Sequence, residues 1–265
     1  MSDRVLPEVD FSVPSPARMY DYYLGGKNNF PADREAAENV IAAFPGIRRL
    51  ARANRGFLVR AVWFLAEHGI RQFIDLGAGI PTTPNVHEVA RQVIPDARVV
   101  YVDNDPVVTR HSQALRATHD GVAAIRGDIR QPQGILADPD LLKVIDFARP
   151  VAVLFIAVLH FIRPDEDPDA IMAAFRWRMA SGSYLAISHA AADGADPDVV
   201  ARIADVYEDA TAPAILRRED EIRGLFTGLE LVEPGLVDVS QWRPEQRTRP
   251  TRIRILAGVG QKTDP

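Results

Sequence analysis

The stretch Phe73-Ile-Asp-Leu-Gly-Ala-Gly-Ile80, together with Val99-Val-Tyr-Val-Asp-Asn-Asp105 downstream, decides the fold of this chain. Each stretch begins as an apolar run that is typical of a buried β-strand. The first run breaks into a glycine turn just after Asp75, and the second ends in a cluster of acids. The carboxyl ends of neighbouring strands form the ligand crevice of an open α/β sheet. The two stretches therefore predict a site for a nucleoside-containing cofactor.

Strands and helices alternate around this turn. Several helix starts place a capping residue before a proline at the first helical position, as in Thr83-Pro84, Asp138-Pro139, Asp167-Pro168 and Asp196-Pro197. The alternation predicts a parallel sheet with helices on both faces. We expect strands near 71–76, 98–103, 122–127, 151–158 and 183–189, with helices near 84–94, 106–118, 139–147 and 167–180.

The two ends of the chain follow other patterns. Helices near 197–210 and 217–227 precede two β-rich runs, 229–239 and 251–259, which lack a helix between them and should pair antiparallel. The prediction is an α/β, Rossmann-like, doubly wound sheet of seven mostly parallel strands with an antiparallel last strand. Residues 1–16 indicate a loose arm, residues 17–32 a polar-aromatic segment, and two helices follow, the second ending at His68-Gly69. We expect an N-terminal arm and helical lid over 1–69 and one core domain over 70–265.

Composition excludes several classes of function. The 265 residues carry a net charge of −5 and show no basic stripe, so nucleic acid is not an expected partner. The absence of cysteine excludes disulfides and a cysteine nucleophile, and no tight Asp/His/Glu cluster indicates a metal. The apolar run from Val151 to Leu159 is too short to cross a membrane, and the first ten residues do not form a secretion signal. We expect a cytoplasmic protein with a small-molecule partner. The sequence does not decide whether the protein forms a homodimer.

The acid beside the glycine turn distinguishes between cofactors. A dinucleotide fingerprint calls for a third glycine at position 82, which is Thr82. Asp75 would also repel a pyrophosphate at the helix N-terminus. S-adenosylmethionine carries an ammonium, a sulfonium and a carboxylate but no phosphate. Asp75 can attract its cationic end while the N–H groups of the turn receive the carboxylate.

Two further acids follow the next two strands. Asp103 lies 24 residues after Gly79, close to the spacing of about 20 for an acid that binds ribose hydroxyls. Asp128, in Ile125-Arg-Gly-Asp-Ile129, can accept from the adenine amino group while Ile129 covers the ring. The alternatives are structural: a strand-to-helix turn for the glycines, a helix cap for Asp103 and a Gly-Asp turn for Asp128.

These motifs resemble class I S-adenosylmethionine-dependent methyltransferases. The stretch Pro14-Ser-Pro-Ala-Arg-Met-Tyr-Asp-Tyr-Tyr-Leu-Gly-Gly-Lys-Asn-Asn-Phe30 is similar, more narrowly, to an actinobacterial S-adenosyl methyltransferase family. The resemblance implies that Asp75, Gly77 and Gly79 hold the methionine end, Asp103 and Asn104 the ribose, and Asp128 and Ile129 the adenine. It also implies that Arg18, Tyr20, Gly25 and Gly26 belong to a lid over the cofactor. Plain helix packing is the alternative for the tyrosines.

The fourth predicted strand ends in His160, which makes this residue the candidate general base. The alternative is a structural histidine at a strand end. His189 is a second pocket candidate, and Trp242 and Arg243 could shape an acceptor site, although a structural role is the alternative for each. The fourth strand lacks the Asn/Asp-Pro-Pro-aromatic motif, which argues against methylation of base or glutamine amino groups.

Three functions are consistent with the sequence. The leading hypothesis is methyl transfer from S-adenosylmethionine to an oxygen or nitrogen of a small molecule, in secondary metabolism. The second is a non-catalytic S-adenosylmethionine-binding regulator or partner subunit. The third, an NAD-linked oxidoreductase, rests on the glycine turn alone, and both Thr82 and Asp75 count against it.

Overall fold

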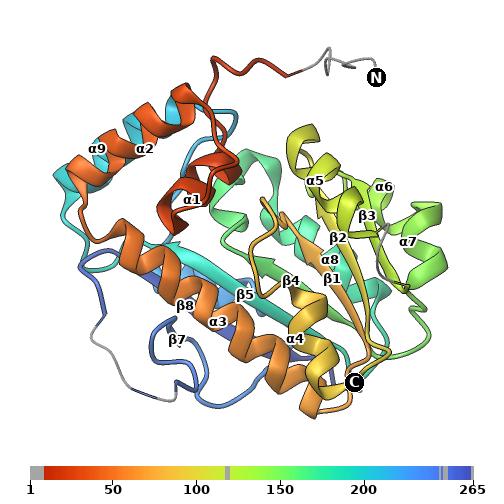
Figure 1. The fold of residues 1–265 in the computed structure, drawn as a ribbon. Helices are drawn as coiled ribbons and strands as arrows, with labels where there is room; N and C mark the ends of the chain where they lie inside the picture. The colour runs from red at the N-terminus through yellow and green to blue at the C-terminus, as the bar shows by residue number, and fades with distance from the viewer. Residues whose placement is uncertain (1–8, 117–119, 245, 247–249, 264–265) are drawn as a thin grey trace, which may run out of the picture.

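The computed structural model describes residues 9–116, 120–244, 246 and 250–263, and Figure 1 shows its mixed sheet with helices on both faces. The strands lie in the order β3-β2-β1-β4-β5-β8-β6, and β7 also pairs with β8. β1 to β5 run parallel, whereas β8 runs antiparallel to β5. The strands are β1 (Gln72–Leu76), β2 (Arg98–Asp103), β3 (Val122–Arg126), β4 (Ala152–Ile156), β5 (Tyr184–Ala191), β6 (Glu230–Leu231), β7 (Val237–Asp238) and β8 (Arg254–Gln261).

The predicted doubly wound fold is confirmed, with one difference in the tail. The run expected as one strand over 229–239 forms two short strands, β6 and β7, which both pair with β8. Gly235 lies between them with φ +82, a left-handed conformation in which glycine is favoured. The chain turns there, so the sheet has eight strands instead of seven.

Alternate residues of the central strands enter two hydrophobic cores, as expected for a sheet that is buried on both faces. In β4, Ala152 and Leu154 belong to the core under the lid, whereas Val153 and Phe155 belong to the core on the opposite face. The first core also contains side chains of α3 (Ile47–Glu67) and α4 (Val86–Val93). The second contains side chains of α6 (Pro132–Leu136), α7 (Pro139–Val144), α8 (Pro168–Arg178) and α10 (Glu219–Gly224).

Most of the predicted helix starts are confirmed. The carboxylates of Asp138, Asp167 and Asp196 accept from backbone N–H groups in the first turns of α7, α8 and α9 (Pro197–Glu208). The Thr83-Pro84 start is wrong, because α4 begins at Val86 with Asn85 as its N-cap residue. The predicted helix over 106–118 is α5 (Pro106–Arg116), and residues 117–118 lie outside the described residues.

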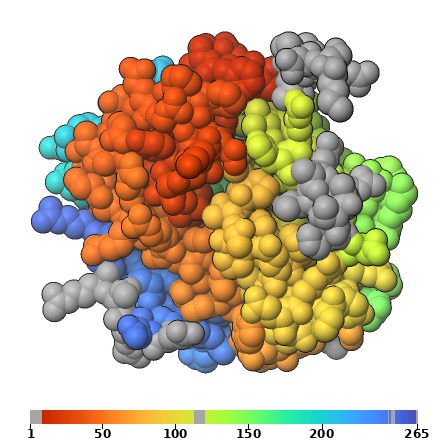
Figure 2. Space-filling model, in the orientation of Figure 1, coloured from red at the N-terminus to blue at the C-terminus, as the bar shows by residue number. Residues whose placement is uncertain are grey.

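The N-terminal helices gather at one end of the sheet. Residues expected as a polar-aromatic segment form α1 (Pro16–Leu24), which precedes α2 (Pro31–Ala43). α1 contacts α2 and α3, and α2 contacts α9 (Figure 1). Figure 2 shows this red and orange region lying against the yellow-green residues of α5. Of the predicted arm, residues 1–8 lie outside the described residues. Over the described ranges, no helix combines the length and hydropathy needed to span a membrane.

Candidate active site

A cavity of about 230 Å³ lies at the carboxyl ends of the strands, beneath the N-terminal helices. Its walls come from the segments that follow β1, β2, β3 and β4, and from α1, α3 and α9. The chain leaves β1 toward β2 on one side, whereas β4 lies on the other side. This reversal of strand order is the position at which open α/β sheets bind ligands.

The three predicted acids line this one cavity. Asp75 lies near the end of β1, Asp103 at the end of β2, and Asp128 just after β3. These strands are neighbours in the sheet, so their carboxyl ends meet at one edge. The structure therefore brings together the carboxylates that the sequence placed 25 to 28 residues apart.

Asp103 is buried and fastened to the glycine turn. Its Oδ2 accepts from the N–H of Gly79 (2.9 Å), and its Oδ1 accepts from the N–H of Asp105 (2.9 Å). Burial nevertheless raises the pKa of Asp103 to about 6. The capping role falls to Asp105, whose Oδ1 accepts from the N–H of Val107 (2.8 Å). Asp103 is thus left to present its carboxylate to the cavity.

Asp75 has the most strongly raised pKa among the acids of the site. Its residue is only 4% exposed, and no described residue donates a hydrogen bond to its carboxylate. Burial raises its pKa to about 7, although the nearby Arg55 acts in the opposite direction and Asp103 adds to the rise. A buried carboxylate that faces a cavity in this state is stabilised by a cationic ligand.

The glycine turn differs from the prediction in one respect. The N–H groups of Gly77 and Ala78 both donate to Val102 O (2.8 and 3.1 Å), and that of Gly79 donates to Asp103. They are therefore not free to receive a ligand carboxylate, because they join the turn to β2. Gly77 and Gly79 both have φ +65, and a Cβ on Gly79 would point into open space. The glycines thus shape the cavity wall.

Arg55, which the sequence analysis missed, is the basic group beside Asp75. It extends from α3 into the cavity lining and donates through Nη2 to the carbonyls of Thr82 and Pro84. Its Nε is buried without a hydrogen-bond acceptor among the described residues. This orphaned donor suits the carboxylate of an amino-acid ligand. The helical pattern around Arg55 could not identify this role, because the carbonyls that Arg55 binds, those of Thr82 and Pro84, lie more than twenty residues downstream.

Asp128 lies at the cavity but already has a cationic partner. Arg130 contacts its Oδ2 at 2.5 Å and Glu166 at 3.1 Å. Burial alone would raise the pKa of Asp128, but the bonds from Arg130 outweigh it and lower the pKa. Asn104 and the buried Ile129 also line the cavity.

Tyr20 reaches the cavity and belongs to a buried polar chain. Its hydroxyl donates to Ala51 O (3.0 Å) and accepts from Asn54 Nδ2 (2.9 Å). Asn54 Oδ1 accepts in turn from the hydroxyl of Ser188 (2.6 Å) on β5. These bonds connect α1 to α3 and to the sheet, so they fix the roof of the cavity.

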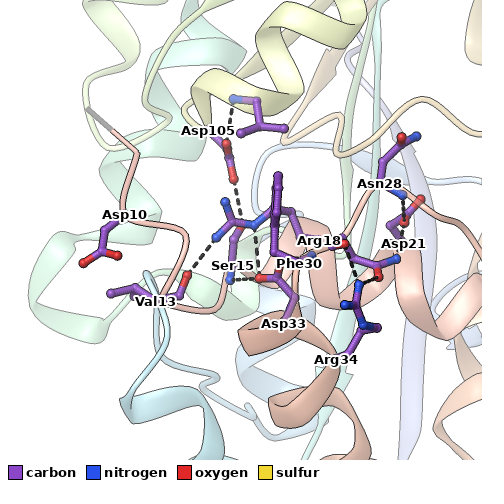
Figure 3. A network of polar contacts seen from close by, with 12 residues as sticks. Asp10, Val13, Ser15, Arg18, Asp21, Asn28, Phe30, Asp33, Arg34 and Asp105 are labelled. Carbon is purple, nitrogen blue, oxygen red and sulfur yellow. Dashed lines mark hydrogen bonds and ion pairs between the residues drawn. The ribbon is translucent and has the colours of Figure 1, made fainter. Parts of the chain in front are cut away.

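Arg18, Gly25 and Gly26 are not brought to the cavity lining. Arg18 Nε contacts Asp33 Oδ1 at 3.1 Å, and its Nη2 donates to Val13 O at 2.8 Å (Figure 3). Gly25 ends α1 with φ +87. A Cβ on Gly26 would lie 2.0 Å from a carboxylate oxygen of Asp21. These three residues shape the N-terminal helices and lie outside the cavity lining.

Two contacts tie the start of α1 to both sides of the cavity. The hydroxyl of Ser15 donates to Asp105 Oδ2 (2.8 Å), as Figure 3 shows, and Thr211 N–H donates to Pro14 O (2.9 Å). Asp33 Oδ1 also accepts from Ser15 N–H (2.9 Å). Residues 14 and 15 therefore form a strap, a segment that connects the acidic edge of the sheet to the segment after α9. The acidic edge consists of Asp75, Asp103, Asp105 and Asp128.

His160 lines the cavity from the short 3₁₀ helix Leu159–Phe161, four residues after β4 ends at Ile156 and not at the end of the strand itself. Burial lowers its pKa well below the usual 6.5, and His189 and Arg217 reinforce this shift, so the ring is neutral. Its Nδ1 accepts from Ala190 N–H over a long 3.4 Å. The neutral tautomer with this bond carries its proton on Nε2, so it can donate to an oxygen of a bound molecule.

His189 does not line the cavity, and its ring nitrogens make hydrogen bonds within the protein. Its Nδ1 donates to Ala190 O (2.8 Å), and its Nε2 accepts from Arg217 Nη1 (2.7 Å). Arg217 also donates to the carbonyls of Leu159 and Ile162, on either side of His160. The histidine and arginine therefore hold the segment that carries His160.

Trp242 and Arg243 also lie outside the lining. Trp242 is fully buried and packs edge-on against Phe57 and Phe64 of α3. The guanidinium of Arg243 lies 4.2 Å from the ring centroid of Phe64. Both residues therefore support α3 from the far side of the fold. The described residues contain no group of three or more acids and histidines placed to hold a metal ion.

Sequence and structure comparisons identify the family. The profile of the S-adenosyl methyltransferase family matches residues 3–263. The chain belongs to this family. S-adenosylmethionine is accordingly its cofactor, which confirms the cofactor predicted from the glycine turn and its acid.

Two solved structures are similar to this member of the S-adenosyl methyltransferase family over nearly the whole chain. A protein from Thermobifida fusca named as a methyltransferase has a TM-score of 0.92 and 42% identity, covering 99% of this chain and 100% of its own. A protein of the DUF574 family from Streptomyces avermitilis has a TM-score of 0.91 and 42% identity, covering 96% and 99%. None of the curated proteins matches the chain.

A more distant structure shares the fold alone. Human N-acetylserotonin methyltransferase, solved in complex with S-adenosylmethionine, has a TM-score of 0.50 and 12% identity, covering 87% of this chain and 57% of its own. The likeness agrees with the mostly parallel sheet and antiparallel last strand of this S-adenosyl methyltransferase.

Proposed function

We propose that this protein transfers the methyl group of S-adenosylmethionine to an oxygen or nitrogen of a small molecule bound in the same cavity. The observation that carries the proposal is the buried carboxylate of Asp75, which faces the cavity beside Asp103 and Asp128. A cationic adenosyl ligand stabilises such a carboxylate, whereas a pyrophosphate would destabilise it.

The residues of the acidic edge fit the parts of the cofactor. Asp75 faces its ammonium, and Asp103 with Asn104 receives the ribose hydroxyls. Asp128 and Ile129 face the adenine. Arg55 offers its orphaned Nε to the carboxylate, in place of the occupied N–H groups of the turn. When bound, the cofactor supplies an electrophilic methyl group on its sulfonium.

His160 is proposed to orient the acceptor. As a neutral donor at Nε2 it can bond to an oxygen of the acceptor beside the attacking atom, so that the attacking atom lies in line with the methyl group while the sulfur–methyl bond breaks and S-adenosylhomocysteine forms. The opposite tautomer would let it remove a proton, which is the general-base role expected from the sequence. In both cases the strap over the cavity excludes water from the reacting atoms.

We expect S-adenosylhomocysteine to bind the purified protein, and Asp103→Ala to weaken that binding by about 1–3 kcal/mol. The loss follows because ribose hydroxyls would face the cavity without a charged partner. Isothermal titration calorimetry measures both affinities. The matched control is Asp165→Ala, which removes an exposed acid outside the cavity lining and should leave the affinity unchanged. Absence of binding by the wild-type protein at millimolar ligand would refute the proposed function.

His160→Ala is expected to lower turnover by about 10²–10⁴-fold if the ring transfers a proton, and by less if it only orients the acceptor. Cofactor affinity should change little in either case. Release of S-adenosylhomocysteine with an acceptor found by screening measures turnover. Because the ring is already neutral, His160 should cause no fall in wild-type rate between about pH 8 and about pH 6.5. Equal losses of rate and cofactor affinity would make His160 a packing residue, and His111→Ala, on the exposed face of α5, is the control.

The second candidate function is a cofactor-binding protein without catalysis. It is favoured by the bond between His160 Nδ1 and the backbone of β5, which occupies one of the two ring nitrogens. The same screen for S-adenosylhomocysteine release separates the two functions. Turnover with any acceptor excludes the non-catalytic role.

A further inference from the structure

Charge divides the cavity into two unequal parts. The charged groups in the lining belong to the acidic edge and its partners: Arg55, Asp75, Asp103, Asp105, Asp128 and Arg130. Five of these six lie at the ends of β1 and β2 or in the segments after β2 and β3, and the sixth, Arg55, interacts with Asp75. The described residues that line the rest of the cavity carry no charge, since His160 is neutral.

The uncharged part lies between the lid and the other half of the sheet. Strands β4, β5 and β8 lie on the side of β1 opposite to β2 and β3. The walls are apolar and buried, and they include Phe44, Leu50, Ile203, Ile253 and Ile255. A carboxylate or ammonium placed here would lose its hydration without gaining a partner. The second ligand of the cavity is therefore uncharged where it meets these walls.

Aromatic rings form much of this part. Phe161 and Tyr207 lie with ring centroids 5.7 Å apart, and Tyr20, Tyr23 and Phe44 also line the cavity. Aromatic side chains contact another ring by stacking or edge-on packing, and such pairs contribute beyond the burial of area. A ring-containing ligand fits walls of this kind.

One polar group stands within the apolar part. The hydroxyls of Tyr23, on α1, and Tyr207, on α9, lie 3.3 Å apart. Two phenols carry two protons, and their mutual hydrogen bond uses one of them. Among the described residues, none accepts the second proton. Burial raises the pKa of Tyr207 to about 12 and that of Tyr23 well above 10, so both hydroxyls remain protonated. The pair therefore presents one donor to the cavity.

We propose that the acceptor is an uncharged aromatic molecule with two polar ends. Its methyl-accepting hydroxyl or ring nitrogen faces His160, and a carbonyl or ether oxygen at the far end accepts from the Tyr23–Tyr207 pair. The inference rests on the proposed function, because it names the acceptor class for the same cavity. It makes the tyrosine pair a determinant of specificity, since a buried donor left unpaired disfavours ligands without the matching oxygen.

The test measures the binding of three related probes to protein saturated with S-adenosylhomocysteine. Umbelliferone is a bicyclic phenol with a lactone carbonyl at the opposite end. Naphthol has the ring system and hydroxyl but no carbonyl, and umbelliferone bearing a carboxylate adds a charge. At slightly acidic pH, where the phenols are neutral, umbelliferone should bind about tenfold more tightly than naphthol. The carboxylated probe should bind at least about a hundredfold more weakly than umbelliferone.

The variant is the double substitution Tyr23→Phe with Tyr207→Phe, because either hydroxyl alone would still offer a donor. Umbelliferone should bind it about tenfold more weakly, while naphthol binds as before. Unchanged affinity for S-adenosylhomocysteine shows that the variant is folded. Tyr22→Phe is the matched control on the same helix, since the Tyr22 hydroxyl donates to Glu38 outside the cavity lining.

The outcomes separate this inference from the proposed function. If S-adenosylhomocysteine does not bind, the proposed function fails and the acceptor class fails with it. If it binds but no probe does, or if the carboxylated probe binds as tightly as umbelliferone, only the acceptor class is overturned. If the double variant retains the full preference for umbelliferone over naphthol, the tyrosine pair does not determine specificity.

Discussion

Asp75→Asn is expected to weaken the binding of S-adenosylhomocysteine about a hundredfold above neutral pH, or ~2.7 kcal/mol. The substitution preserves the volume of the side chain and removes its charge. The carboxylate is buried in the cavity wall and has no hydrogen-bond donor among the described residues. The ammonium of the ligand would supply both a donor and a positive charge. Calorimetric titration of wild-type and variant protein measures the difference.

The affinity of the wild-type protein should also depend on pH. With a pKa of about 7, Asp75 holds a proton in part of the molecules at neutral pH. Binding of a cation requires the ionised form, so the affinity should rise about eightfold between about pH 6 and about pH 7.5. Asp103, with a pKa of about 6, adds a rise of about twofold. Asp75→Asn should retain only this smaller rise.

The same substitution should stabilise the unliganded protein. Folding raises the pKa of Asp75 from 3.8 to about 7, so its contribution to stability is present below about pH 4 and is lost as the pH rises through about 7. Above that pH the folded chain holds a buried charge that Arg55 compensates only in part, and Asp75→Asn removes a cost on the order of 2–4 kcal/mol. Urea denaturation at about pH 7.5 measures the gain.

Asp96→Asn is the control for both effects, because Asp96 pairs with Arg71 on the surface and its side chain is 75% exposed. It should change neither cofactor affinity nor stability by more than a few tenths of a kcal/mol. If Asp75→Asn binds the cofactor as the wild-type protein does, the carboxylate does not meet the cationic end, and the orientation of the cofactor proposed above is wrong.

Much of the acidic edge could be predicted because it follows from strand order. Asp75, Asp103 and Asp128 each lie where an apolar run ends, and neighbouring parallel strands bring such positions to one edge. The sequence could not show that the N–H groups of the turn would bind Val102 and Asp103, because that depends on how the turn packs against β2. The N–H groups expected to receive the ligand carboxylate are occupied by these contacts, and we propose Arg55 in their place.

The lid illustrates a second limit. Tyr23 and Tyr207 are 184 residues apart, and no local pattern predicts that their hydroxyls meet. The N-terminal motif presented the opposite difficulty. Its resemblance to the family implied that Arg18, Gly25 and Gly26 belong to a lid over the cofactor, whereas their contacts lie within the N-terminal segment and outside the cavity lining. A motif specific to one family can reflect folding as well as binding.

Arg18→Met is expected to lower the free energy of unfolding by about 3–5 kcal/mol. Arg18 is only 1% exposed, and its guanidinium pairs with the fully buried Asp33 and lies near the rings of Phe11 and Phe30 (centroids at 6.0 and 5.5 Å). Removing it leaves the charge of Asp33 buried without its cation. Asp33 also accepts from the N–H groups of Ser15 and Phe30, so the strap should loosen. Urea denaturation and hydrogen exchange over residues 9–30 measure the global and local losses.

Arg48→Met is the matched control, because Arg48 pairs with Glu38 at 3.3 Å on the surface and its loss should cost at most about 1 kcal/mol. Adding Asp33→Asn to Arg18→Met should recover part of the stability, since the orphaned charge disappears while an amide oxygen remains to accept hydrogen bonds. Because Arg18 is outside the cavity lining, the affinity of the folded variant for S-adenosylhomocysteine should change little. A large loss of affinity with normal stability would instead place Arg18 at the cofactor.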